Sequence, residues 1–168
     1  SVVNALSVEL KVQVKRAGKI HEQDYSKGKP LNKLKVIGDT SETGTTVTFK
    51  PDPEIFQVSD FHYDVLATRL RELAFLNKGV EIILADKREK GETETFKYDG
   101  GIKEFVAFVD QNKTPLHEVI YFEKEKNDVS VEIALRYNSG YREDVFSFVN
   151  NINTIEGGTH LSGFKTSL

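Results

Sequence analysis

The chain has 168 residues, 38% of them hydrophobic, which is enough for a real core in one ordinary domain or two small ones. Its 26 acidic and 23 basic residues give a formal net charge of −3, which excludes a global positive field that would draw the chain to nucleic acid. The lack of cysteine excludes disulfides and thiolate metal sites, and the apolar runs are too short to span a bilayer, so we expect a soluble globular protein.

The first third of the chain predicts mainly β-structure. Residues 1–6 have the pattern of a helix interior. Residues 9–15 alternate polar and apolar side chains, which predicts a half-buried strand, and residues 16–19 supply the turn of a hairpin. We expect an antiparallel meander of strands at residues 9–15, 20–25, 34–37 and 45–49.

The next segment changes period and predicts the longest helix. Ser59 is a candidate N-cap, and residues 77–79 supply a C-cap. Between these caps, apolar residues recur at three- and four-residue steps: Phe61, Val65, Leu66, Leu70, Leu73 and Leu76. A hairpin of residues 80–84 and 93–98 is expected to follow, and the change of pattern at residues 99–101 predicts a domain boundary, with domains at 1–100 and 101–168.

The second part predicts an α+β arrangement. A short amphipathic helix is expected at residues 102–109, and a strand at residues 119–122 follows a polar connector. Residues 129–137 alternate cleanly and predict another strand, along which residues 145–149 are expected to return. A last helix is expected from His160 onward.

Two glycine-centred stretches are candidate sites. Gly157-Gly158-Thr159-His160 lacks the lysine of a common phosphate loop, which favours a simple turn with Thr159 as helix cap over a phosphate cradle. In Thr43-Gly44-Thr45, the glycine permits close backbone approach and a threonine hydroxyl can donate and accept hydrogen bonds. A ligand contact and an ordinary β-branched strand both remain open there.

The histidines, carboxylates and clustered cations of the sequence do not indicate a metal site or a catalytic site. The four histidines do not fall at metal-ligand spacings, and the denser carboxylate groups lie in predicted hairpin loops. A local basic face or a solvated helix flank would explain the cations Arg69, Arg71, Lys87, Arg88 and Lys90.

Six separated blocks, in order along the whole chain, strongly resemble the B-subunit family of bacterial DNA gyrases. The blocks are residues 1–7, 43–45, 49–53, 69–77, 100–102 and 150–160. This resemblance implies an α+β fold in which residues 1–100 form the C-terminal part of a GHKL-type (Bergerat) ATPase domain with its sheet and helix layers. Residues 101–168 would then begin a transducer domain of ribosomal-protein-like βαβ type.

The resemblance also implies roles for single residues. Thr45 matches the threonine that helps hold adenine, Val47 an apolar wall of the same pocket, and Arg16 an arginine that contacts coumarin inhibitors. Ser1 matches a nucleotide-binding position directly after the ATP lid. Gly157-Gly158-Thr159-His160 matches a conformational element of the transducer domain and not a phosphate cradle.

The function that the resemblance implies is that of an ATP-hydrolysing type II DNA topoisomerase in the cytoplasm. ATP and Mg²⁺ would be its cofactors, and a second B subunit, the gyrase A subunit and double-stranded DNA its partners. The family's catalytic glutamate, its metal-binding asparagine and its adenine-reading aspartate match no position in this chain, nor does its transducer lysine. We therefore expect a piece of a longer protein that is inactive alone. A topoisomerase IV B subunit and a non-enzymatic α+β binding module are the alternatives.

Overall fold

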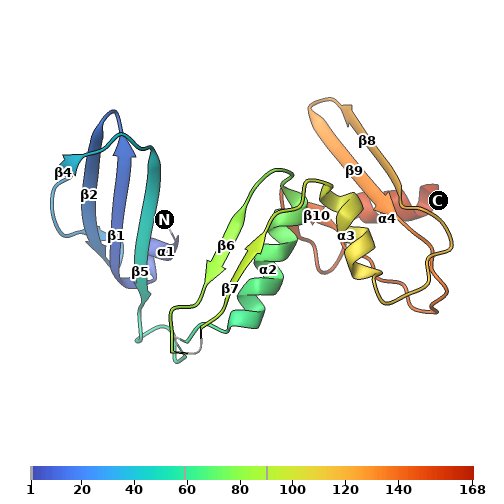
Figure 1. Cartoon of the computed structure of the whole chain (residues 1–168), viewed down its shortest axis with the longest axis horizontal. Coiled ribbons are helices and arrows are strands. Elements are labelled where there is room, and N and C mark those ends of the chain that lie inside the picture. Colours follow the sequence, from blue (N-terminus) through green and yellow to red (C-terminus); the bar gives the residue numbers. More distant parts are fainter. Residues whose placement is uncertain (1, 59, 90) are drawn as a thin grey trace. The chain divides into compact units, whose positions relative to one another are not determined.

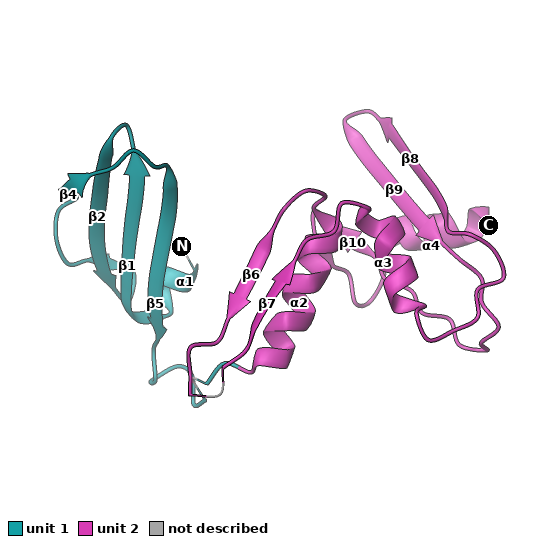
Figure 2. Cartoon of the chain, viewed as in Figure 1, with its two compact units in different colours: residues 1–61 teal, residues 62–168 magenta. Residues whose placement is uncertain are grey.

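The computed structural model describes residues 2–58, 60–89 and 91–168. The chain divides into two compact units, Ser1–Phe61 and His62–Leu168 (Figure 2). The boundary expected at residues 100/101 lies inside the second unit, and a functional division there stays a prediction. Every helix of the described residues is too short or too polar to cross a membrane.

The first unit is an antiparallel sheet with one short helix. Its elements are α1 (Val2–Ala5), β1 (Ser7–Arg16), β2 (Lys19–Ser26), β3 (Lys29–Pro30), β4 (Lys35–Asp39) and β5 (Gly44–Pro51). The strand order is β3-β2-β1-β5, and β4 also pairs with β2. Strands β1, β2, β4 and β5 were expected and the short β3 was not. The expected meander is wrong, because β5 pairs with β1 and not with its sequence neighbour β4 (Figure 1).

The β1–β2 connection is a two-residue turn. Ala17 and Gly18 both have positive φ, 52° and 76°, as a two-residue type I′ turn requires. Such a turn matches the right-handed twist of the strands, so β1 and β2 stay paired from Leu10 opposite Tyr25 up to the turn itself.

The second unit combines helices with three separate hairpins, which confirms the α+β class. Its elements are α2 (Tyr63–Leu76), β6 (Ile82–Ala85), β7 (Thr93–Phe96), α3 (Gly101–Val109), β8 (Ile120–Lys126), β9 (Val129–Leu135), β10 (Phe148–Val149), β11 (Ile152–Asn153) and α4 (Thr159–Ser167). The pairs are β6 with β7, β8 with β9, and β10 with β11, all antiparallel.

Two local expectations for this unit are wrong, and a third cannot be compared. Residues 148–149 pair with residues 152–153 in a hairpin of their own, so they do not return along β9. Thr159 does not cap α4, because Gly158 is its N-cap residue and no side chain caps it. Helix α2 begins at Tyr63 after His62, and the expected cap Ser59 lies outside the described residues.

The core of the second unit lies where α2 packs on the β6–β7 hairpin. Ala67, Ala74 and Phe96 are buried there together. Phe75 is 1% exposed and stacks on Tyr98 at a centroid distance of 3.6 Å. Its ring also lies 5.0 Å from Phe105 of α3, so one aromatic cluster joins α2, the hairpin and α3.

Candidate functional site

The predicted nucleotide residues meet on one face of the first unit's sheet. In the β1–β5 register, Thr45 lies opposite Val14 and Val47 lies opposite Val12. Cross-strand partners project to the same face, as do alternate residues along a strand. Thr45, Val47, Val12, Val14 and Arg16 therefore share one face of the sheet, which we call the Thr45 face.

The opposite face carries a network of charges. Glu22, only 7% exposed, accepts a hydrogen bond of 2.7 Å from Gln13 Nε2 and lies 3.2 Å from Lys35 Nζ and 3.7 Å from Lys11 Nζ. The Gln13 amide, followed by the Lys35 ammonium, holds the pKa of Glu22 below its ordinary value. The network fixes β1, β2 and β4 together and leaves the Thr45 face as the more apolar side.

The Thr45 face is open within the described residues. Thr45 and Arg16 are exposed, and Val47 is 51% exposed. The face presents the Thr45 hydroxyl, the apolar side chain of Val47 and, at its end, the Arg16 guanidinium. Further walls are needed to enclose a nucleotide base. Ser1 lies outside the described residues.

The predicted basic face is largely neutralised. Arg69 pairs with Glu72 at 2.7 Å and Arg71 with Glu94 at 2.7 Å. Arg88 binds Asp86, which lies 2.6 Å away. Lys87 is exposed, and Lys90 lies outside the described residues. The structure favours the interpretation of Arg69 and Arg71 as a paired helix flank, and it places Arg88 in the β6–β7 loop.

The glycine-rich stretch before α4 forms a turn. Gly157 has a φ of 78°, a left-handed conformation in which glycine carries no steric cost, and its N–H donates to the Thr154 carbonyl at 2.8 Å. The imidazole Nε2 of His160 lies 3.4 Å from the Thr154 hydroxyl. Whether this turn is structural or contacts a phosphate stays a prediction.

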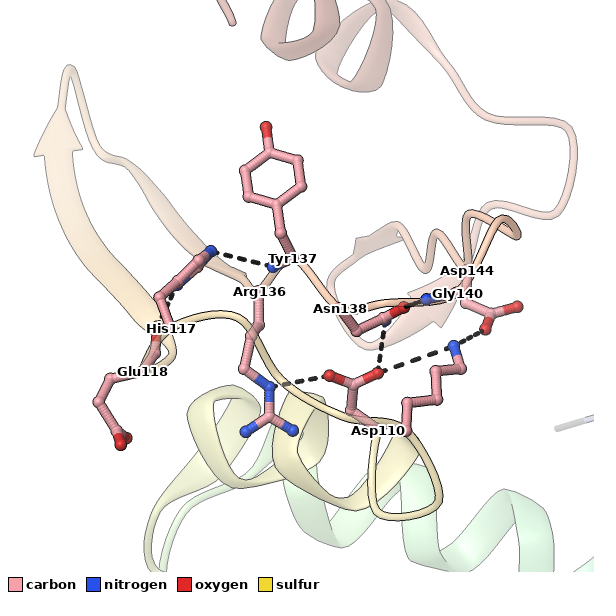
Figure 3. Close-up of polar contacts among 9 residues, drawn as sticks. Asp110, His117, Glu118, Arg136, Tyr137, Asn138, Gly140 and Asp144 are labelled. Carbon is pink, nitrogen blue, oxygen red and sulfur yellow. Dashed lines mark hydrogen bonds and ion pairs between the residues drawn. The ribbon is translucent and has the colours of Figure 1, made fainter.

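A buried polar network around Asp110 escaped the sequence analysis (Figure 3). Asp110 is 5% exposed and accepts hydrogen bonds from Arg136 Nε at 2.8 Å and Asn138 Nδ2 at 2.7 Å. Lys113 lies 3.7 Å from Asp110 and 2.6 Å from Asp144. The network fastens the end of α3 to the segment after β9. Its members are scattered along the chain, so no motif could have revealed it.

Beside this network, His117 links the connector to the same segment (Figure 3). Its Nδ1–H donates to the Glu118 carbonyl at 2.6 Å, and its Nε2 accepts from the Tyr137 N–H at 3.0 Å. Both ring nitrogens contact the backbone, so the connector is held to the segment after β9.

A second unexpected cluster joins α2 to the β8–β9 hairpin. Lys78 Nζ donates to Glu132 at 2.8 Å and to the Tyr121 hydroxyl at 3.0 Å. Glu132, followed by Tyr121, raises the pKa of Lys78 above its ordinary value. Within the part of the chain that the structure describes, no group of three or more His, Asp or Glu residues is placed to hold a metal ion.

The comparisons with known proteins all point in one direction. Residues 101–168 match the family model described as DNA gyrase B. Over 170 aligned residues, the whole chain is 54% identical to the DNA gyrase B subunit of Bacillus cereus and 54% identical to that of Clostridium acetobutylicum. It spans 42% of the first relative and 26% of the second.

A solved structure agrees with these sequence matches. It is the 43K ATPase domain of Thermus thermophilus gyrase B in complex with an aminocoumarin. The likeness has a TM-score of 0.88 at 37% identity and covers 99% of this chain and 46% of that one. The chain is therefore similar, over its whole length, to a segment of DNA gyrase B proteins, and the DNA gyrase B family model covers its residues 101–168.

Proposed function

We propose that the chain forms part of the ATP-binding subunit of a bacterial DNA gyrase. In this role it couples ATP binding and hydrolysis to closure of a DNA gate, strand passage and negative supercoiling. The observation that carries the proposal is the end-to-end match: 54% identity to a gyrase B protein along the whole chain, together with a TM-score of 0.88 to a gyrase B ATPase domain.

The proposed division of labour follows the expected boundary near residue 100. Residues 1–100 contribute the C-terminal part of the GHKL ATPase domain, and residues 101–168 contribute the first part of the transducer domain. Two observations support this boundary: the family match starts at residue 101, and α3 begins there after β7 has ended at Phe96.

In the proposed ATP site, the Thr45 face forms one wall. The Thr45 hydroxyl contacts the adenine, Val47 supplies an apolar surface and Ser1 binds nucleotide close by. Arg16 is placed to contact an aminocoumarin, the kind of inhibitor bound to the Thermus thermophilus relative. The shared face of Thr45, Val47 and Arg16 supports this assignment. Other parts of the longer protein would supply the catalytic base and the groups that hold Mg²⁺.

The partners of the proposed enzyme are a second B subunit, the gyrase A subunit and double-stranded DNA, in the cytoplasm. The relatives named above are gyrase B proteins, which favours gyrase over topoisomerase IV. The net charge of −3 gives this segment no general attraction to DNA, so the DNA contacts of the enzyme would be local or made by its partners.

The test is a topology assay on the full-length protein, reconstituted with its A-type partner on relaxed plasmid. We expect ATP-dependent negative supercoiling that stops when ATP or the partner is left out. Decatenation without supercoiling would instead identify a topoisomerase IV protein. If ATP does not change DNA topology at all, the non-enzymatic binding module becomes the better interpretation.

A further inference from the structure

The tip of the β10–β11 hairpin has an unusual backbone. Asn150 and Asn151 both have positive φ, 49° and 65°. This is the type I′ turn, in which both central residues are left-handed and asparagine and glycine are preferred. The turn holds Phe148 opposite Asn153 and Val149 opposite Ile152.

Two hydrogen bonds connect this tip to α2 and its C-cap residue Asn77, and a third orients the Asn77 side chain. Asn151 Nδ2 donates to Asn77 Oδ1 at 2.8 Å, and Asn77 Nδ2 donates to the Leu73 carbonyl at 2.7 Å. Arg69 donates to the Asn151 carbonyl at 3.1 Å. Residues 69 and 77 are about 12 Å apart along a helix at 1.5 Å per residue. The turn is therefore fixed in both position and direction along α2.

The base of the hairpin leads directly to α4. The hydroxyls of Ser147 and Thr154 lie 2.5 Å apart, and the Thr154 N–H donates to the Ser147 carbonyl at 2.8 Å. The Thr154 hydroxyl also lies 3.4 Å from Nε2 of His160, in the first turn of α4. Helix α4 buries none of its residues; besides this contact with the hairpin base, its Lys165 lies 3.3 Å from the Glu143 carboxylate.

We propose that Asn151 is a positioning residue that makes α4 follow α2. The hydrogen bonds of the tip cross the expected boundary at residues 100/101, from the ATPase part to the transducer part. A shift of α2 during the ATP cycle is then carried by the hairpin to His160 and α4. This inference rests on the proposed gyrase function.

Other contacts join α2 and the residues that follow it to α3 and to the β8–β9 hairpin. Lys78 holds the β8–β9 hairpin through Tyr121 and Glu132, and Phe75 packs on Phe105 of α3. These contacts keep α2 in the second unit when the Asn151 side chain is removed. A variant at Asn151 therefore tests the connection to α4 without dissolving the unit.

The experiment compares Asn151→Gly with Asn150→Gly in the full-length protein, assembled with its A-type partner. Glycine suits both positions of a type I′ turn, so each variant keeps the hairpin. Only Asn151→Gly removes the amide bonded to Asn77. The measurements are the ATP turnover rate and the number of supercoils introduced per ATP hydrolysed. A second readout is hydrogen exchange at residues 152–160 with and without a non-hydrolysable ATP analogue.

We expect Asn151→Gly to lower the supercoils per ATP by about threefold or more, within the range that changes in coupling networks produce. ATP turnover should remain, and the nucleotide-dependent exchange change at residues 152–160 should be lost. Asn150→Gly should behave like the unmodified protein.

Equal supercoils per ATP in the two variants would overturn the inference, as would a matched fall of turnover and supercoiling in Asn151→Gly. A lack of ATP-dependent supercoiling in the unmodified protein would overturn the proposed function itself. The two failures are thereby told apart.

Discussion

At the scale of single residues, Thr45 is the member of the Thr45 face that we propose contacts the adenine. Its neighbour Thr46 is the same residue type on the same strand, but lies opposite Gln13 and so projects to the charged face. We expect Thr45→Ala in the full-length protein to weaken ATP binding by about 1 to 2 kcal/mol, because a hydrogen bond to the base is left unmade. Titration calorimetry measures this loss.

The matched control is Thr46→Ala, which should leave ATP affinity unchanged because its side chain is on the other face of β5. Arg16→Leu provides a second contrast: it should spare ATP binding and weaken the binding of an aminocoumarin. An unchanged affinity for ATP in Thr45→Ala would remove this residue from the site.

Asp52 carries the clearest pH prediction. Its side chain is 2% exposed, and it accepts the Glu54 N–H at 3.0 Å and faces Lys27 Nζ at 3.0 Å. The Glu54 N–H, followed by Lys27, holds the pKa of Asp52 below its ordinary value. A lowered folded-state pKa stabilises the fold above the unfolded value of about 3.9, and this stability disappears as the pH falls through the folded pKa.

We therefore expect Asp52→Asn to lower the melting temperature of the chain at pH 7, with a difference from the unmodified chain that shrinks below about pH 4. Thermal melting followed by circular dichroism across this range measures it. Glu54→Gln removes the other, exposed partner of Lys27 and should change little, since exposed ion pairs contribute little stability. A difference that stays constant down to pH 3 would contradict the assigned pKa.

At the scale of elements, the start of α3 depends on a glycine. Gly101 has a φ of 61°, and a Cβ at this position would overlap the Lys78 side chain, which is held by Glu132 and Tyr121. We expect Gly101→Ala to destabilise the chain by about 1 to 2 kcal/mol, the cost of a left-handed L-residue. Urea unfolding measures the change in the free energy of unfolding.

A glycine inside a helix provides the contrast. Gly163 lies within α4, and a Cβ there would meet no atom within 4 Å. Gly163→Ala should therefore stabilise the helix, by up to about 1 kcal/mol. If Gly101→Ala and Gly163→Ala shift the unfolding curve in the same direction, the different backbone conformations of the two glycines do not determine the effect of an added Cβ.

The elements also show what a sequence can and cannot predict. The alternation of residues 9–15 predicted β1, and the three- and four-residue spacing of leucines predicted α2, because burial imposes a local period on each. The period of apolar residues does not show which other strand a strand pairs with. For this reason β5 was expected beside β4, and residues 148–149 were expected beside β9, whereas each pairs elsewhere.

The same limit applies to the candidate site. The resemblance named Thr45, Val47 and Arg16, but only the β1–β5 register shows that they share a face. Asp110 gave no signal at all, because an aspartate at the end of a helix is ordinarily solvated and its partners Arg136 and Asn138 are more than twenty residues away. Long-range pairing of polar groups leaves no periodic trace in a sequence.

At the scale of the whole molecule, the second unit is tied together across the expected domain boundary. The aromatic cluster around Phe75, the Lys78 cluster and the Asn151 hydrogen bonds each join α2 and the residues that follow it to elements beyond residue 100. Three separate contacts of different chemistry make α2 and the following elements one compact unit, which explains why the chain divides at residue 61 and not at residue 100. A boundary of function can therefore lie inside a unit of structure.

The last prediction concerns the chain of 168 residues by itself. Transfer of a phosphoryl group requires a positioned water, a metal ion and positive charge around the γ-phosphate. The resemblance assigns the family's catalytic glutamate, metal-binding asparagine and transducer lysine to no position in this chain, and the role proposed for the Thr45 face is contact with the base alone. We expect this chain to show no Mg²⁺-dependent release of phosphate from ATP above the blank, while the full-length protein shows it. Turnover by the 168 residues alone, abolished by Thr45→Ala, would mean that the chemistry resides in groups of this chain that the gyrase interpretation does not identify.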